Sequence, residues 1–447
     1  MLKVCLTGGP CAGKSTVLSA LVAALEPRGY KVLIVPETAT ELILNGIAPG
    51  ENISLDKFQE FVLDKQLFKE KLYLDAVDFY GDKTVIICDR GIMDQLAYIN
   101  KDKFEVLMKE RGMSFNDGFA WYDCVLHLVT AADGAEEFYQ WNDPNKPDSG
   151  NNAARRESPE EARHLDKKTL NSWVGHPHLK VIDNSTNFSD KVNRVIDYVF
   201  SMLGEPERKK VQKKFLVKKP SKSRINSMGH VAHMTIMQTY LNSPENIERR
   251  IRQIGNDNGG YNFYYSETKN LENNERLITE RKISPREYHN LLIDMDTSLH
   301  SIKKSRYCFV NNNSYFNLDI FPFSSEYALL EVEDDVNIDF FEVIKEVTDD
   351  INFRNYELAK TMVFNVNAED IPKTCAIEPV WFYETGRDET EILGSGSRTY
   401  NVVTTKDESE AFELVKKCSR NYLKRKCKMN GMIISQWYDF YSKEWLE

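Results

Sequence analysis

Residues 2–25 read LKVCLTGGPCAGKSTVLSALVAAL, and this stretch decides the fold of the first half of the chain. A short apolar run typical of a buried strand leads into a glycine-rich turn, and a helical run begins at Lys14. Residues 8–15 match the spacing G-x-x-x-x-G-K-[ST] without a gap, which predicts a phosphate-binding loop. The loop and its first flanking residue are Gly8, Gly9, Pro10, Cys11, Ala12, Gly13, Lys14, Ser15 and Thr16. An ordinary strand–turn–helix corner is the alternative.

The chemistry of phosphate binding explains why these residue types stand at this spacing. Gly8 and Gly13 let the backbone wrap closely around a polyphosphate, so that its N–H groups point inward. The Lys14 ammonium reaches the β- and γ-phosphates, and the Ser15 hydroxyl is suited to bind Mg²⁺. The positive end of the following helix also favours an anion. We therefore expect Mg²⁺ with GTP or ATP as the ligand, and the choice of base stays open.

Apolar strand candidates alternate with helical runs over the first two hundred residues. Strands are predicted at Leu2–Thr7, Lys31–Val35, Thr84–Cys88, Cys124–Val129 and Leu179–Ile182. Helices are predicted at Lys14–Leu25, Leu55–Tyr80, Asp94–Ile99 and Asp190–Leu203. This alternation predicts an α/β domain whose parallel sheet is covered on both faces. Ligands bind beyond the carboxyl ends of the strands in such sheets, so the residues that follow the strands are candidate site residues.

Charged residues follow the second and third predicted strands. Glu37 comes after the second strand, and Asp89 and Arg90 come after the third. Near a polyphosphate, one carboxylate can hold Mg²⁺ and another can accept the proton of an attacking hydroxyl. Asp89 and Ser15 are the predicted metal ligands. A helix cap or a surface turn is the alternative for each carboxylate.

A long polar stretch, Trp141–Arg163, follows the fourth predicted strand and contains Arg155 and Arg156. A capping box with proline at the first helical position starts a new helix at Ser158, directly after the arginine pair. We expect a lid whose closure brings Arg155 or Arg156 to the transferring phosphoryl group. A solvated basic turn is the alternative. Residues 145–148 read NKPD, which matches the N-K-x-D element by which small GTPases read guanine. In that family the element directly follows a strand, whereas here it lies later, in a proline-rich loop.

This first half resembles P-loop kinases of the nicotinamide-riboside-kinase and deoxynucleoside-kinase type. The resemblance rests on GGPCAGKST, on Glu37, on the Asp89–Arg90 pair and on the arginine-containing lid. It implies Glu37 or Asp89 as the catalytic base, and Arg90 as a phosphate clamp. It also implies Arg155 and Arg156 as the lid cations.

After a basic stretch at 201–224, the pattern changes to strand after strand, which predicts an antiparallel meander or barrel. Residues at i and i+2 share a face of a strand. Four charged pairs have this spacing: Arg250 with Arg252, Glu280 with Lys282, Lys304 with Arg306, and Glu331 with Glu333. Any one pair could face water, but four pairs in one meander favour a polar channel.

Residues 207–365 resemble the triphosphate tunnel (CYTH-type) family. The resemblance rests on Arg250-Ile251-Arg252, Lys269, Lys303-Lys304-Ser305-Arg306, Asp319 and Leu330-Glu331-Val332-Glu333. It implies an anion site made by Lys214, Arg250, Arg252, Lys269, Lys304, Arg306, Glu331 and Glu333. The E-x-E-x-K element of the family falls on 210–214, where Lys210 and Gln212 replace both metal-binding carboxylates. We therefore expect a basic tunnel for a phosphorylated ligand, with its metal-dependent hydrolysis in doubt.

The order of a P-loop domain and then a tunnel-like domain resembles the TRPL-translocation-defect family of membrane-trafficking proteins, which implies GTP and phosphoinositide binding. We expect three domains, at 1–204, 205–365 and 366–447. The last is a small α/β extension with strands near Val380–Glu384 and Thr399–Thr404 and a helix from Ser409 to about Lys428. Basic residues crowd that predicted helix, which indicates either a solvated face or a contact with anionic lipid.

Composition limits the class of protein. The net charge of −10 argues against nucleic-acid binding through the whole surface. Eight cysteines without a C-x-x-C pair suit a reducing compartment, and the first strand begins at Leu2, so we expect a cytoplasmic protein without a signal peptide. No apolar run approaches the ~20 residues that span a bilayer, although peripheral contact with a membrane stays open.

Three functions compete on this evidence. The first is a regulatory nucleotide-binding protein whose tunnel binds a phosphorylated partner such as a phosphoinositide headgroup. The second is a small-molecule kinase for a nucleoside or nicotinamide riboside. The third is a triphosphate hydrolase that acts in the tunnel, against which Lys210 and Gln212 count.

Overall fold

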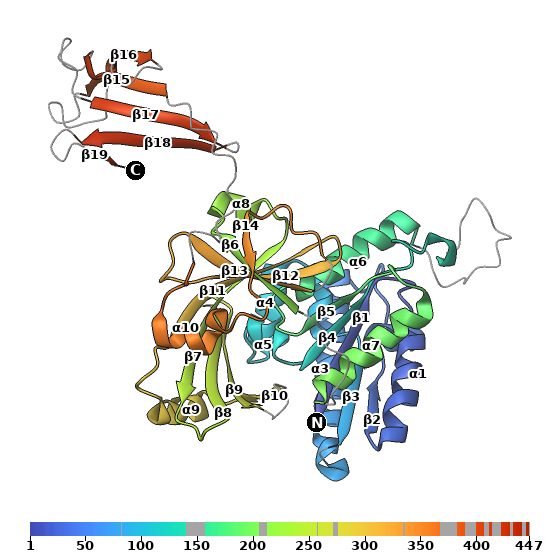
Figure 1. The fold of residues 1–447 in the computed structure, drawn as a ribbon. Helices are drawn as coiled ribbons and strands as arrows, with labels where there is room; N and C mark the ends of the chain where they lie inside the picture. The colour runs from blue at the N-terminus through green and yellow to red at the C-terminus, as the bar shows by residue number, and fades with distance from the viewer. Residues whose placement is uncertain are drawn as a thin grey trace. The chain divides into compact units, whose positions relative to one another are not determined.

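A computed structural model shows how these segments are arranged (Figure 1). It describes residues 1–81, 83–139, 157–204, 212–256, 258–270, 276–333, 336–366, 382–388, 399–405, 411–413, 422–429, 432–439 and 444–446. The chain forms two compact units, Met1–Asp370 and Ile371–Glu447. The residues predicted as a P-loop domain and those predicted as a tunnel domain therefore lie in one unit.

The first sheet is parallel and five-stranded, in the order β2-β3-β1-β4-β5, as the alternating pattern predicts. Its strands are β1 (Leu2–Gly8), β2 (Lys31–Val35), β3 (Thr84–Asp89), β4 (Cys124–Leu128) and β5 (Leu179–Ile182). The helices around it are α1 (Lys14–Leu25), α2 (Thr38–Leu44), α3 (Leu55–Tyr80), α4 (Lys101–Glu110), α5 (Phe115–Phe119), α6 (Pro159–Trp173) and α7 (Phe188–Met202). β1 and β4 are buried along their whole length, because helices cover both faces of the sheet.

One predicted helix has a different form. The segment expected at Asp94–Ile99 is the 3₁₀ segment η2 (Ile92–Ala97). The Asp94 carboxylate accepts hydrogen bonds from Thr7 Oγ1 at 2.6 Å and from Trp173 Nε1 at 2.6 Å. These buried contacts tie the segment to β1 and α6, which favours a short tight turn over an amphipathic helix.

The second sheet of the same unit is antiparallel and has the order β10-β9-β8-β7-β11-β12-β13-β6-β14. Its strands are β6 (Gln212–Lys218), β7 (Val231–Leu241), β8 (Ile247–Asn256), β9 (Gly260–Asn270), β10 (Arg276–Ile283), β11 (Ile302–Asn311), β12 (Ser314–Ile320), β13 (Tyr327–Glu333) and β14 (Val343–Glu346). Three short helices accompany it: α8 (Lys222–Asn226), α9 (Pro285–Leu291) and α10 (Asn355–Thr361). The meander predicted from the strand pattern is therefore an antiparallel sheet.

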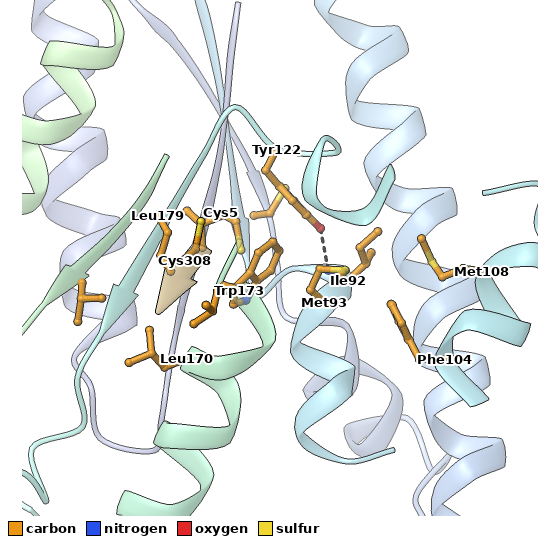
Figure 2. Packing of buried hydrophobic residues seen from close by; sticks show 14 of the residues in the cluster. Cys5, Ile92, Met93, Phe104, Met108, Tyr122, Leu170, Trp173, Leu179 and Cys308 are labelled. Carbon is orange, nitrogen blue, oxygen red and sulfur yellow. Dashed lines mark hydrogen bonds between the residues drawn. The ribbon is translucent and has the colours of Figure 1, made fainter. Parts of the chain in front are cut away.

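The two sheets share one hydrophobic core. Met234 and Ile236 of β7 and Cys308 of β11 belong to the same buried cluster as Trp173 of α6. Figure 2 shows Cys308 beside Cys5, Leu179 and Trp173. On the same face of β11, Lys304 and Arg306 continue the alternation, so this face carries charged residues next to apolar ones.

The loop between α6 and β5 closes this contact. Gly175 has φ 114°, and a Cβ there would lie 3.1 Å from Cβ of Ala232 in β7. The Tyr315 hydroxyl of β12 accepts from Gly175 N and donates to His176 O, both at 3.2 Å. The fixed arrangement of the two sheets thus rests on glycine at position 175.

The unit Ile371–Glu447 contains an antiparallel sheet in the order β16-β15-β17-β18-β19. Its strands are β15 (Phe382–Asp388), β16 (Thr399–Thr405), β17 (Tyr422–Met429), β18 (Met432–Asp439) and β19 (Glu444–Leu446). The helix predicted from Ser409 to about Lys428 is present at 411–413 but wrong over 422–428, where β17 pairs with β15 and β18. Among the described residues, no helix is both long and apolar enough to cross a membrane.

Candidate functional site

The predicted phosphate loop joins β1 to α1, and its geometry requires glycine at two positions. A Cβ at Gly8 would lie 2.1 Å from the carbonyl oxygen of Leu128 in β4. Gly13 has φ 86° and caps the N-terminus of α1. Both residues allow a backbone path that other side chains would block, and α1 directs its N-terminal N–H groups to this loop.

Gly9 has a partner that the loop spacing does not reveal. Its N–H donates to Oδ1 of Asp166 in α6 at 2.6 Å, and a Cβ at Gly9 would lie 2.7 Å from that oxygen. Asp166 also lies 3.3 Å from Nε2 of the buried His127 in β4. Burial opposes ionisation, but His127 and the Gly9 N–H hold the pKa of Asp166 below its ordinary value. α6 is thereby attached directly to the phosphate loop.

The Lys14 ammonium lies over the loop, where it donates to the carbonyl oxygens of Gly8 and Gly9, each at 3.1 Å. Burial and the neighbouring Arg90 lower the pKa of Lys14 to about 8. A bound polyphosphate would stabilise the ammonium form, because an opposite charge raises the pKa of a cation.

The two strand-end carboxylates have different environments. Oε1 of Glu37 accepts from Nε of Arg90 at 2.9 Å. Burial opposes ionisation of Glu37, but the positive charges of Arg90 and Lys14 hold its pKa below its ordinary value. Burial raises the pKa of Asp89, against the opposing effect of Lys14, and among the described residues its buried Oδ1 has no hydrogen-bond partner. Asp89 is therefore the better-suited proton acceptor of the two.

Several buried polar atoms without a hydrogen-bond partner lie at the end of β3 and in the segment that follows it. Asp89 Oδ1, Arg90 Nη1 and both side-chain amide atoms of Gln95 are buried without a hydrogen-bond partner in the described part of the chain. Leaving such groups unpaired costs about 1–3 kcal/mol each. A polar ligand could supply the missing partners for a carboxylate, a guanidinium and an amide. The sequence analysis missed Gln95 because no motif marks it.

Arg90 is held in a strained backbone conformation, with φ 76°. Its N–H donates to Leu6 O at 2.9 Å, and its carbonyl accepts from Gln66 Nε2 at 3.1 Å. Gln66 in turn donates to the fully buried Glu70, which pairs with Lys3 Nζ at 2.8 Å. This buried network fixes the backbone of Arg90, from which its guanidinium group extends. Sequence patterns alone do not reveal the network.

Several predicted residues lie outside the described residues. They are Arg155 and Arg156 of the expected lid, and the element at 145–148. The helix predicted to follow is present: α6 begins at Pro159, and Ser158 Oγ accepts from Glu161 N at 3.3 Å.

The donor set around the loop fits a magnesium ion. Ser15 is exposed at the start of α1, and the Asp89 carboxylate has a buried oxygen without a hydrogen-bond partner in the described ranges. Mg²⁺ typically takes only one or two protein ligands and completes its shell with water and phosphate oxygens. The described residues contain no group of three or more His, Cys, Asp or Glu side chains that could hold a metal alone.

A charged cavity of about 400 Å³ lies on the face of the nine-stranded sheet that carries Lys304 and Arg306. Its lining includes Lys214, Arg250, Arg252, Lys304, Arg306 and Glu331, which come from β6, β8, β11 and β13. The positive charges in this lining outnumber the negative ones, which favours a polyanionic ligand.

Ion pairs hold these cations in place. Lys304 Nζ lies 2.5 Å from Asp319, and Arg306 bonds Asp319 at 2.6 Å and Glu331 at 2.9 Å. Lys214 lies 3.2 Å from Glu331. Burial opposes ionisation of Glu331, but Lys214 and Arg306 hold its pKa far below its ordinary value. Burial lowers the pKa of Lys304 to about 8, although Asp319 opposes this.

Of the residues predicted for the anion site of the tunnel, Lys269 needs correction, and the side chain of Glu333 lies outside the described residues. Lys269 pairs in register with Ile247 and shares a face with Glu267, whereas Arg250 and Arg252 lie on the opposite face. Its ammonium is 3.6 Å from Glu267 and its side chain is 54 % exposed, so the expectation that it joins the anion site is wrong. Glu333 lies in β13, but its side chain is outside the described part.

The comparisons with known proteins support a P-loop-like first domain. A family model described as "AAA domain" matches residues 3–191. No curated protein matches this chain.

Solved structures give weak likenesses. The hypothetical protein NE1496 is 24% identical, covers 34% of this chain and 99% of its own, and has a TM-score of 0.26. The PH1012 protein from Pyrococcus horikoshii OT3 is 20% identical, covers 27% of this chain and 77% of its own, and scores 0.21. A conserved hypothetical protein from Pyrococcus furiosus is 21% identical, and the match covers 28% of this chain and 78% of that protein with a TM-score of 0.21. With scores this low, the case for nucleotide binding rests on the AAA-domain match and the loop geometry.

Proposed function

We propose that this protein binds a magnesium-bound nucleotide, GTP or ATP, at the loop between β1 and α1. The observation that carries this proposal is the loop itself. Its glycines at positions 8 and 13 are required by close contact and positive φ, and the Lys14 ammonium lies over it. Ser15 and Asp89 would hold Mg²⁺, which would neutralise phosphate charge.

We further propose that the charged cavity of the nine-stranded sheet binds a phosphorylated ligand such as a phosphoinositide headgroup. Support comes from five cations of its lining, which three strands, β6, β8 and β11, bring together: Lys214, Arg250, Arg252, Lys304 and Arg306. The resemblance to the TRPL-translocation-defect family adds a regulatory or trafficking role, with the protein in the cytoplasm or in peripheral contact with membranes. Gln212 stands where the tunnel family has a metal-binding carboxylate, which disfavours triphosphate hydrolysis.

A small-molecule kinase is the second candidate, favoured by the unsatisfied atoms of Asp89, Arg90 and Gln95. In this reaction Asp89 would take the proton of an acceptor hydroxyl instead of binding Mg²⁺, which Ser15, water and phosphate oxygens would then hold. The hydroxyl oxygen would form a bond to the γ-phosphorus, and the bond to the bridging oxygen would break to release the nucleoside diphosphate. Arg90 would stabilise the charge on the transferring group.

A crossed melting experiment on the full chain tests both sites. Parent, Lys14→Ala and Arg250→Ala proteins are heated with Mg²⁺-GTP, Mg²⁺-ATP or inositol 1,3-bisphosphate, because ligands stabilise by mass action. We expect Lys14→Ala to lose only the nucleotide shift and Arg250→Ala to lose only the inositol phosphate shift. If both variants keep both shifts, the two site assignments are wrong.

A further inference from the structure

A second cavity lies where the α/β layers meet the nine-stranded sheet, and neither proposed ligand explains it. Its volume is about 780 Å³, within the ~300–1,000 Å³ range of small-molecule sites. One wall comes from the end of η2, from α5 and from α6, and the other from β7 and the β8–β9 hairpin. It shares no lining residue with the charged cavity, and no phosphate-loop residue lines it.

The walls of this cavity are held together by direct hydrogen bonds, so the space does not depend on a ligand to form. Asn116 of α5 donates its backbone N–H to Gly259 O at 2.9 Å and its side-chain amide to Gly260 O at 2.7 Å. Asn262 of β9 donates to Asn116 O at 2.9 Å. A preformed site loses less free energy to ordering when it binds.

The lining is rich in rings. The aromatic and imidazole side chains are those of Tyr98, Phe115, Phe119, His230, His233 and Tyr264. Burial lowers the pKa of both His230 and His233, so both rings are neutral at pH 7. Rings of this kind offer stacking and edge-to-face contacts to a flat ligand.

Little net charge faces the space. The charged residues of its described lining are Lys101, Glu105 and Lys168, and the first two pair with each other at 3.6 Å. One net cation remains, on α6. A polyphosphate would lack counter-charges here, unlike in the cavity around Arg306.

We propose that this cavity binds an aromatic small molecule that is uncharged or carries a single negative charge. Such a ligand would contact both walls and so stabilise the contact between the α/β layers and the nine-stranded sheet. The site is separate from the nucleotide loop, so the proposal stands or falls independently of nucleotide binding.

The test uses 1-anilinonaphthalene-8-sulfonate, a singly anionic aromatic probe, in fluorescence titrations of the full chain without nucleotide. Ile254→Trp and Asn171→Trp fill the cavity from opposite walls. Ile293→Trp is the matched control, because Ile293 is 88% exposed and does not line the cavity. Using two walls guards against one variant failing to fold, which circular dichroism would detect.

We expect saturable binding at one site in the parent and in Ile293→Trp, and at least about tenfold weaker binding in both filled variants, equivalent to about 1.4 kcal/mol. Equal binding by the control and a folded filled variant would overturn the proposal. So would the lack of a saturable site in the parent.

Discussion

The Asp319 carboxylate holds the buried cations of the charged cavity in place, and Asp319→Asn tests that role. Its side chain is 1% exposed and accepts from Lys304 Nζ at 2.5 Å and from Arg306 Nε and Nη2 at 2.6 and 2.7 Å. Lys304 and Arg306 are themselves 4% and 15% exposed. Asparagine keeps the shape of the side chain but removes the charge that compensates both cations.

The expected loss is large because the charges are buried. Removing one partner of a buried ion pair costs about 3–5 kcal/mol. Burial opposes ionisation, but Arg306 and Lys304 hold the pKa of Asp319 below its ordinary value. The stabilisation is therefore fully present above the unfolded pKa of about 3.9, and it is lost as the pH falls through the lowered folded value.

Urea unfolding of the full chain at neutral pH measures this loss, with Asp75→Asn as the control because Asp75 is 65% exposed. Tripolyphosphate in EDTA should stabilise Asp319→Asn more than the parent, since the added anion replaces the lost charge. Saturation at 100 times the dissociation constant gives about 2.7 kcal/mol. The explanation is refuted if Asp319→Asn loses no more stability than the control, or if tripolyphosphate stabilises parent and variant equally.

Three further changes test other parts of the two sites. Gly9→Ala should weaken nucleotide binding at least about tenfold, or about 1.4 kcal/mol, because the added methyl group would meet Asp166. Gly50→Ala is the control, because its methyl group meets nothing within 4 Å, and it should bind nucleotide as the parent does in titration calorimetry. If the protein is a kinase, Asp89→Asn should cut the rate of phosphoryl transfer about 10²–10⁴-fold while nucleotide binding is kept. Because burial raises the pKa of Asp89, the rate of the parent should fall toward acid at a pH above the usual carboxylate range. Unchanged turnover in the variant would exclude Asp89 as the base. Tripolyphosphate binding should weaken as the pH rises through about 8, where Lys304 loses its proton, and a flat profile in calorimetry would contradict this.

The first sheet could be predicted from the sequence because its signals are local. β2 and β5 have the predicted bounds, and so do α1 and α3. Each of these elements carries its own periodic apolar pattern, and the glycine spacing of the loop fixes the turn between β1 and α1.

Contacts between distant parts of the chain could not be predicted in the same way. Polar residues such as Gln238 and Thr239 interrupt the apolar pattern of β7, yet both are buried in the folded sheet. Asp166 binds Gly9 across 157 residues, and no local pattern announces that bond. The family resemblance implied that Lys269 joins the anion site, but the register with β8 places it on the opposite face from Arg250 and Arg252, since a shift of one residue reverses the side of a strand.

Nucleotide binding at the β1–α1 loop is the central claim, and titration calorimetry of Mg²⁺-ATP and Mg²⁺-GTP into the full chain tests it most directly. Lys14→Ala removes the ammonium that lies over the loop, and Lys71→Ala, 71% exposed on α3, is the matched control. We predict that the parent and Lys71→Ala bind at least one of these nucleotides at one site per chain and that Lys14→Ala does not. Binding by Lys14→Ala with the affinity of the parent would contradict the assignment of the loop.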